Sequence, residues 1–198
     1  MAYTTIDDGS AHFQTLLYTG DGTSSQAQTN TGNSNLQPDW VWIKKRAGGS
    51  ARSHQLYDST RGVTKLLHSN STSAESTQSA GLTAFNSDGF TVGNDDGIGA
   101  NAATYAAWQW KANGGTTASN SNGTITSTVQ ANTAAGFSII SYTGNGSDGA
   151  TIGHGLNSTP EVFFPKCLST TTNWEMYYFP PGGTKQYGYL NLNNAFAT

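Results

Sequence analysis

Charge and cysteine are both scarce in this chain of 198 residues. Charged side chains make up 11% of the sequence, whereas ordinary soluble domains contain roughly 25%. The formal net charge is −3, and the densest basic cluster is Lys44-Lys45-Arg46. Binding of nucleic acid requires many clustered Lys and Arg side chains, so we expect no nucleic-acid partner. The single cysteine, Cys167, excludes a framework of intrachain disulfides, and without a histidine close in sequence we expect a passive thiol.

The sequence also lacks long apolar runs. No stretch approaches the ~20 apolar residues of a membrane-spanning helix, and the N-terminus has no apolar segment of the kind found in signal peptides. We therefore expect synthesis in the cytoplasm and no membrane insertion. Ser, Thr, Asn and Gly take the place of the missing charges, a composition that is common in extracellular adhesive proteins and viral appendages.

Residue patterns typical of catalysis are missing as well. No Gly-x-Ser-x-Gly motif occurs, the four histidines have no metal-ligand spacing, and the glutamates are only Glu75, Glu161 and Glu175. The segment 144–149 fits the dinucleotide pattern G-x-G-x-x-G, but further glycines behind it disfavour the helix that this motif must open, so we interpret it as a β-turn. We expect no enzyme activity, no cofactor, and no catalytic or metal-binding residues.

One acidic loop has two interpretations. Residues 94–97 (NDDG) place three oxygen-bearing side chains beside a glycine, which is a composition that calcium loops share. The spacing and the distal glutamate of an EF-hand are absent. We favour a polar hairpin loop, with a weak calcium site as the alternative.

What the sequence has instead is an internal repeat. Three blocks recur in the same order: 13–22 (FQTLLYTGDG) as 137–146 (FSIISYTGNG), 36–44 (LQPDWVWIK) as 158–166 (STPEVFFPK), and Tyr57 and Lys65 as Tyr177 and Lys185. A repeat of this length indicates tandem globular modules and not a solenoid. The first copy ends on 105–111 (YAAWQWK), which has no counterpart in the second. We expect the second copy to be incomplete, its open edge being completed by further sequence or covered by another subunit.

The repeat divides the chain into four parts: an N-terminal arm 1–12, a first module 13–112, a linker 113–133 rich in Gly, Ser, Thr and Asn, and the start of a second module 134–198. Short β-prone runs separated by turn residues predict an all-β fold of antiparallel β-sandwiches. The strand at 40–44 has apolar residues on both faces and is expected to be central. The β-prone stretch 124–129 in the linker is a candidate to pair with a sheet edge and fix the two modules.

Aromatic residues are the candidate contact residues. Four of the five tryptophans alternate within predicted strands, where core packing is the usual role. Trp174 and the cluster Tyr177-Tyr178-Phe179 lie near predicted loops, and rings in such places can stack on sugars. Structural packing is the alternative for these residues too.

The motifs, taken in order, resemble a domain that is repeated in virion proteins of tailed bacteriophages. They are YTGDG at 18–22, QPDWVWIKKR at 37–46, LYDSTRG at 56–62, FNSDGFTVG at 85–93 and YAAWQWKA at 105–112. The resemblance covers the first module and the first half of the second. It implies a jelly-roll or concanavalin-like sandwich in tail fibres or appendages, and it implies no catalytic residues. The second copy departs from the pattern, with Pro165 in place of Ile43 and Phe179-Pro180-Pro181 in place of Ser59-Thr60-Arg61.

From this resemblance we expect a structural virion protein, here the N-terminal part of a tail fibre or appendage. Residues 1–12 are expected to dock it on other tail or head proteins. Self-association is also expected, with a trimer as the arrangement common in phage fibres, and this step rests on analogy alone. The alternatives are a lectin-like module that binds a host-surface glycan through exposed aromatics, and a head decoration protein.

Overall fold

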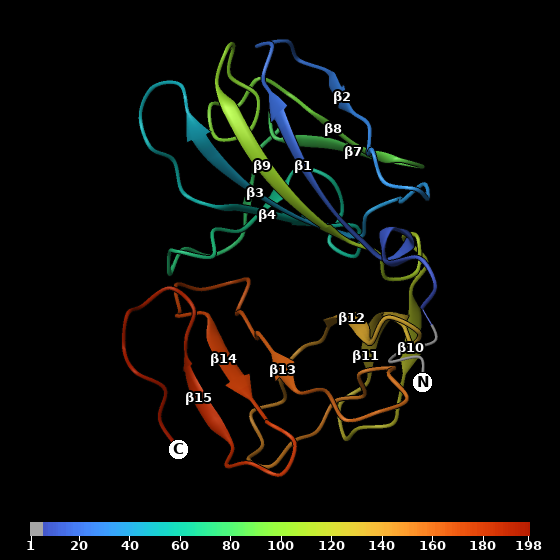
Figure 1. Cartoon of the computed structure of the whole chain (residues 1–198). Coiled ribbons are helices and arrows are strands. Elements are labelled where there is room, and N and C mark those ends of the chain that lie inside the picture. The colour runs from blue at the N-terminus through green and yellow to red at the C-terminus, as the bar shows by residue number, and fades with distance from the viewer. Residues whose placement is uncertain (1–5) are drawn as a thin grey trace.

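The computed structural model describes residues 6–198 and shows an all-β chain. Within that range the one helical element is a short 3-10 turn, η1 (Gly9–Ala11), and no helix is long and apolar enough to cross a membrane. The strands form several antiparallel sheets, arranged in two halves that follow each other along the chain (Figure 1). The predicted all-β class is therefore confirmed.

The main sheet of the first half has four strands. Their order is β1 (Phe13–Thr19), β9 (Thr104–Trp110), β3 (Trp40–Ala47) and β4 (Gln55–Asp58), with antiparallel neighbours throughout. The strand that begins at Trp40 lies between β9 and β4, so its predicted central position is confirmed.

A second sheet covers one face of the first. Its order is β2 (Gln26–Gln28), β8 (Gly89–Val92) and β7 (Leu82–Asn86), and a short ladder of β5 (Lys65–Leu66) and β6 (Ser76–Thr77) lies beside it in sequence. Gly89 begins β8 at φ +103°, and a Cβ there would meet the Gln28 carbonyl oxygen at 2.0 Å. Glycine is thus required at this predicted hairpin for its positive φ and for the close approach of β2.

The core of the first half lies between these two sheets. Val41 and Ile43 alternate along β3 so that both point inward, where they join Tyr57 of β4 and Phe90 of β8 in one buried cluster. The first half is therefore a two-layer β-sandwich. The outer face of its main sheet carries the tryptophans of β3 and β9, which turn toward the second half of the chain.

The second half contains two three-stranded sheets. One has the order β10 (Ala118–Asn120), β11 (Ser127–Asn132) and β12 (Phe137–Ser141), and the other β13 (Val162–Phe163), β14 (Glu175–Tyr178) and β15 (Gln186–Tyr189). The segment predicted as a linker, 113–133, thus contains the whole of β10 and of β11. Of the stretch 124–129, which we expected to pair with a sheet edge, residues 127–129 lie in β11, and Thr128 and Val129 pair with β12.

The two copies of the repeat share their strand register. In the first copy Val41 pairs with Tyr57, and in the second copy the corresponding Phe163 pairs with Tyr177. A bond just beyond these pairs is repeated too: Ser59 N donates to Asp39 O at 2.9 Å, and Phe179 N donates to Glu161 O at 2.7 Å. The β13–β14 pair is therefore the counterpart of the β3–β4 pair.

The copies differ in what lies beside these strands. In the first copy β9 joins β1 to β3. In the second copy β12 and β13, the counterparts of β1 and β3, belong to separate sheets. The described chain, residues 6–198, holds no counterpart of β7, β8 or β9 in the second copy.

The described part of the predicted N-terminal arm lies on the first module. Asp8 caps η1 by accepting from Ser10 N at 2.9 Å, and its other oxygen accepts from the Ser34 hydroxyl at 2.6 Å. Residues 6–12 are thus anchored to a loop of their own chain. The predicted docking role of 1–12 falls partly on residues 1–5, which lie outside the described range.

Candidate binding surface

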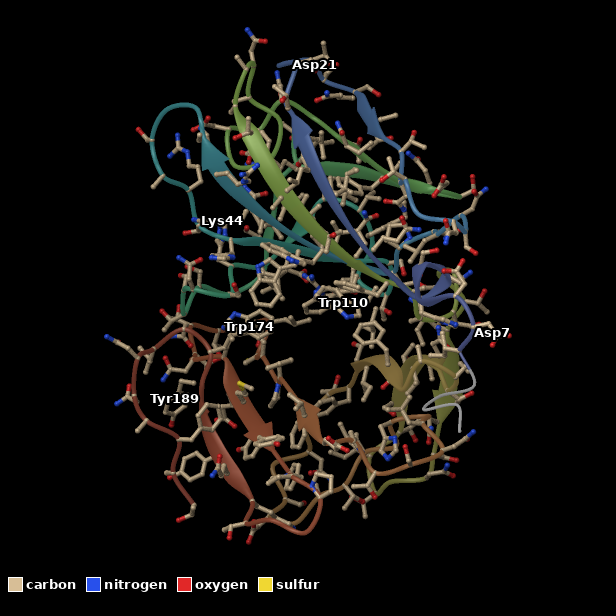
Figure 2. All side chains as sticks on the ribbon, viewed as in Figure 1. Asp7, Asp21, Lys44, Trp110, Trp174 and Tyr189 are labelled. Carbon is tan, nitrogen blue, oxygen red and sulfur yellow. The ribbon has the colours of Figure 1, made fainter. Side chains whose placement is uncertain are left out.

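Trp174 is buried between the two halves of the chain and does not face solvent. Its side chain is 2% exposed, and its indole Nε1 donates to the His68 carbonyl oxygen at 2.9 Å. It forms one apolar cluster with Leu56 and Leu67 of the first half, and Trp40 and Trp42 pack against that cluster. Figure 2 shows Trp174 on the side of the second half that faces the first. The outer face of the main sheet carries apolar side chains such as Trp40 and Trp42, and Trp174 covers part of that face. A ring buried to this extent has no face open for stacking on a sugar, which favours the alternative of structural packing for Trp174.

The other predicted aromatics belong to a different environment. Phe163 lies between Tyr177, at a ring distance of 4.7 Å, and Phe179, at 5.5 Å, with both pairs nearly parallel. Tyr187 of β15 adds a further ring 6.4 Å from Tyr177. We call these four residues the aromatic stack. Phe163 is 40% exposed and Tyr187 is 46% exposed, so the stack reaches the surface.

Sequence reasoning selected two members of the stack and missed the other two. Tyr177 and Phe179 were predicted, whereas Phe163 and Tyr187 were not. Tyr178 is the neighbour of Tyr177 in β14, so its side chain points to the opposite face, and it has no ring contact with the stack. The repeat could have identified Phe163, because this residue corresponds to Val41. An aromatic residue at a core position of an incomplete copy is a candidate for an exposed ring.

Charged side chains border the stack on two sides. The Tyr177 hydroxyl donates to Glu175 Oε2 at 2.7 Å, and this bond, with burial and the negative charge of Glu175, raises the pKa of Tyr177 to about 12. Lys185 Nζ lies 5.3 Å from the ring centroid of Phe179, a cation–π geometry. The surface is therefore apolar in its centre and polar at its rim, as in surfaces that bind peptides or sugars.

The stack is open because, within residues 6–198, the covering layer of the first copy has no counterpart beside it. Val41 and Tyr57, which correspond to Phe163 and Tyr177, are fully buried under the β2–β8–β7 sheet. The same contrast holds for Tyr18 of β1, which is 9% exposed, whereas its counterpart Tyr142 is 48% exposed. Core positions of the first copy are thus surface positions in the second.

A cavity of about 370 Å³ lies next to this exposed face. Its wall includes Tyr142, the residue directly after β12, together with Phe163 of β13 and the apolar side chains of Ile125 and Ile152. The glycine-rich segment 144–149 contributes residues 144–147 to the lining, and Ala150 follows directly behind it. That segment contains turns and no helix, so its interpretation as a turn and not as a dinucleotide site is supported.

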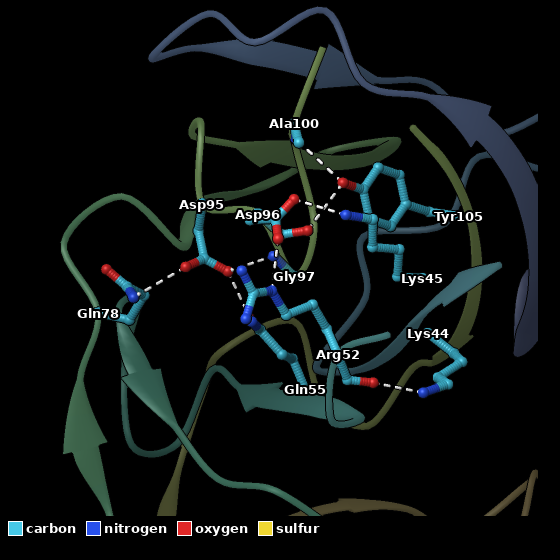
Figure 3. A network of polar contacts seen from close by, with 10 residues as sticks. All are labelled: Lys44, Lys45, Arg52, Gln55, Gln78, Asp95, Asp96, Gly97, Ala100 and Tyr105. Carbon is cyan, nitrogen blue, oxygen red and sulfur yellow. Dashed lines mark hydrogen bonds and ion pairs between the residues drawn. The ribbon is translucent and has the colours of Figure 1, made fainter. Parts of the chain in front are cut away.

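The acidic loop at 94–97 is occupied by the chain's own side chains (Figure 3). Asp96 pairs with Lys45 Nζ at 2.5 Å and with Arg52 Nε, and these hydrogen bonds hold the pKa of Asp96 below its usual value. Asp95 accepts from Gln55 Nε2 at 2.6 Å and from Gln78 Nε2 at 2.9 Å. With its carboxylates engaged in this way, the loop fits the interpretation as a structural loop better than the calcium alternative.

Other titratable groups do not gather into a site. Among residues 6–198, no three His, Cys, Asp or Glu side chains lie close enough together to hold a metal ion. Cys167 is exposed, and hydrogen bonds from Thr170 and Ser169 lower the pKa of its thiol to about 6. The thiol is therefore more acidic than the passive thiol that we expected.

The fold and these surfaces define an all-β protein with one complete sandwich and a second copy that exposes aromatic core positions. A family model described as a domain of unknown function (DUF7483) matches residues 8–198, and the chain belongs to that family. The match extends over both copies of the repeat. No curated protein matches the chain, and no solved structure does.

Proposed function

We propose that this chain is part of a structural virion protein of a tailed bacteriophage, and that it serves in a tail fibre or related appendage. The proposal is supported by the order of phage-like motifs from 18–22 to 105–112. The single observation that carries it is the firm connection between the two copies. An appendage that projects from a particle needs successive modules that are held in a constant relation.

Asp39 is at the centre of this connection. The buried carboxylate accepts from Ala112 N and Gly114 N at 2.7 and 2.8 Å through one oxygen, and from Gly115 N at 2.7 Å and the Ser59 hydroxyl at 2.7 Å through the other. Three backbone donors on one carboxylate hold the chain where it leaves β9.

The next segment is held as firmly. Gln130 of β11 is fully buried, and its amide nitrogen donates to the hydroxyls of Ser59 and Thr60 at 2.9 and 2.8 Å. Its amide oxygen accepts from Gly115 N at 3.0 Å, next to the Asp39 carboxylate. Although residues 113–133 have the composition of a flexible linker, their backbone and side chains are tied to both halves.

The location of the chain in a phage particle tests this proposal. We expect an antibody raised against residues 1–198 to label tails in electron micrographs of particles that carry the protein, at a copy number that is a small multiple of the fibre number. Labelling spread over the capsid at high copy number would identify a head decoration protein and overturn the appendage assignment. Particles without label, and without the chain in their mass spectrum, would overturn the virion assignment as a whole.

Glycan binding is a second candidate, and the aromatic stack is the observation that favours it. Exposed parallel rings with a Glu and a Lys at the rim suit the apolar face and the hydroxyls of a sugar. On a glycan array we would expect binding that is lost in Tyr187→Ala and kept in Tyr142→Ala, an equally exposed tyrosine outside the stack. Binding that survives Tyr187→Ala, or no binding at all, would count against this role.

A further inference from the structure

We propose that His54 makes the contact between the two halves of the chain sensitive to pH. Its neutral imidazole holds the indole of Trp42, and protonation in mildly acidic solution releases that indole and loosens the contact. The contact in question is the apolar cluster of Leu56, Leu67 and Trp174, which we call the connecting cluster. His54 has this role whether or not the chain belongs to a virion.

The first observation is the bond between Trp42 of β3 and His54, the residue directly before β4. Trp42 Nε1 lies 2.7 Å from His54 Nδ1, and an indole nitrogen can only donate. His54 Nδ1 is therefore the acceptor, and the proton of the neutral ring is on Nε2. A second proton can be added to His54 only at the nitrogen that Trp42 already uses.

His68 has the opposite arrangement. Its Nδ1 lies 2.8 Å from the backbone carbonyl oxygen of His54, and a carbonyl oxygen can only accept. His68 Nδ1 therefore carries the proton of the neutral ring. When His68 is protonated at Nε2, Nδ1 remains a donor and the bond persists. Of these two neighbouring histidines, only His54 must give up a hydrogen bond to take up a proton.

Both histidines are connected to the connecting cluster. Trp174 Nε1 donates to the backbone carbonyl oxygen of His68 at 2.9 Å, and Trp42 packs against the cluster that contains Trp174. An indole N–H that loses its acceptor beside apolar side chains costs free energy unless the ring moves toward water. Protonation of His54 therefore opposes the packing of Trp42 between the two halves.

The surroundings of His54 also disfavour a positive charge. Burial of the ring, and after it the nearby ammonium of Lys44, lower the pKa of His54 below its usual value. Arg52 is paired with Asp96, and Lys166 of the second half donates to backbone carbonyl oxygens. Within the described part of the chain, no carboxylate forms an ion pair with His54. The imidazolium form would thus have no counter-ion.

The direction of the pH dependence follows from these contacts. Once the cluster opens, His54 takes up a proton near its ordinary pKa of about 6.5. In the closed state it does so only at lower pH, because its pKa is lowered there. Between these two values the open state binds more protons than the closed state. The contribution of His54 is therefore complete above the ordinary pKa and is lost as the pH falls through the lowered one.

Two glutamine variants and one proton resonance test the hydrogen-bond step. His54→Gln keeps an acceptor oxygen for Trp42 but does not titrate. His68→Gln keeps a donor for the His54 carbonyl oxygen and is the matched control. By NMR of the labelled chain from pH 7.5 to pH 5, we expect the Trp42 indole N–H resonance to move as His54 titrates in the wild-type chain and in His68→Gln. In His54→Gln we expect it to stay constant.

Amide hydrogen exchange measures the contact between the halves. After correction for the intrinsic pH dependence of exchange, we expect residues 165–174 to exchange about threefold faster or more at pH 5 than at pH 7.5 in the wild-type chain. His68→Gln should show the same increase, and His54→Gln should show none. Thermal melts at pH 7.5 verify that both variants fold.

Three results would overturn the proposal. The first is an equal increase in exchange in His54→Gln and in the wild-type chain. The second is an increase that disappears in His68→Gln and remains in His54→Gln, because this would assign the response to the other ring. The third needs no variant: a wild-type His54 that titrates at its ordinary pKa while the Trp42 resonance stays fixed would show that protonation and this bond are compatible.

Discussion

The two copies of the repeat share a strand register and differ in burial. The pair Val41–Tyr57 and its counterpart Phe163–Tyr177 lie in the same ladder position, yet the first pair is fully buried and the second reaches the surface. Register is determined locally, by the two strands that pair and by the turn between them. Burial is determined by a second layer that comes from elsewhere. The comparison shows that the strand register of a sandwich can form without a covering sheet, whereas the burial of its core residues requires that sheet.

The largest effect that distinguishes the copies should come from the matched tyrosines. We expect Tyr57→Ala to lower the free energy of unfolding by about 4 kcal/mol, because it opens a cavity in a closed core. Tyr177→Ala removes the same side chain from an open face and should cost about 1 kcal/mol. Urea unfolding at neutral pH, followed by circular dichroism, measures both variants. Equal costs would mean that the two cores are equally complete.

The second comparison concerns the acids at the equivalent positions. We expect Asp39→Asn to lower the free energy of unfolding by about 3 kcal/mol, since an amide nitrogen would face backbone donors in a buried place. Glu161→Gln should change it by less than about 0.5 kcal/mol, as is usual for an exposed side chain. A loss of stability in Glu161→Gln as large as in Asp39→Asn would contradict the idea that only the first acid has its amide partners.

A third comparison separates the polar network of the first copy from the open surface of the second. Lys45 has a side chain that is 2% exposed, and Asp96 is one of its few partners. We expect Asp96→Asn to lower the free energy of unfolding by about 2 kcal/mol, because it leaves the buried Lys45 ammonium with a neutral partner. The loss is limited to this size because Asp96 itself is partly hydrated. Asp148→Asn, in an exposed loop of the second copy, is the matched control and should be neutral.

The same network gives a pH dependence with a defined sign. The pKa of Asp96 is lowered by its bonds to Lys45 and Arg52, so its contribution is present above the pKa of the unfolded chain and is lost as the pH falls through the folded value. We therefore expect the difference in stability between the wild-type chain and Asp96→Asn to shrink below about pH 4. A difference that stays constant to pH 2 would exclude this linkage.

Local patterns predicted much of the fold. The alternation of Trp40 to Ile43 predicted a central strand, and the repeat predicted corresponding strands at 137–141 and 162–163. Such features depend on neighbours along the chain or on similarity between two segments, and both are visible in a sequence.

The features that sequence reasoning missed depend on distant contacts. Trp174 is covered by residues more than a hundred positions away, such as His68, so nothing near it in sequence indicated burial. The Asp39 clamp was missed because its partners are backbone amides, which carry no side-chain signature. The composition of 113–133 suggested flexibility, whereas the contacts of Gln130 determine its order.

The last comparison is between Lys45 of the first copy and Cys167, its counterpart in the second. Here we expect little change in stability but a clear pH dependence of the reactivity of the thiol. Lys45 is buried in the network described above, whereas Cys167 is exposed and has a thiol pKa of about 6. The thiolate is the nucleophile, so the rate of alkylation by iodoacetamide should rise through pH 6 and level off near pH 7 in the folded chain. In urea the same rate should rise through about pH 8.5, the ordinary range of a cysteine thiol. Thr170→Val removes the hydroxyl that bonds to Cys167 and should move the folded profile toward the unfolded one. A folded profile centred near pH 8.5 would show that these hydroxyls do not stabilise the thiolate in solution.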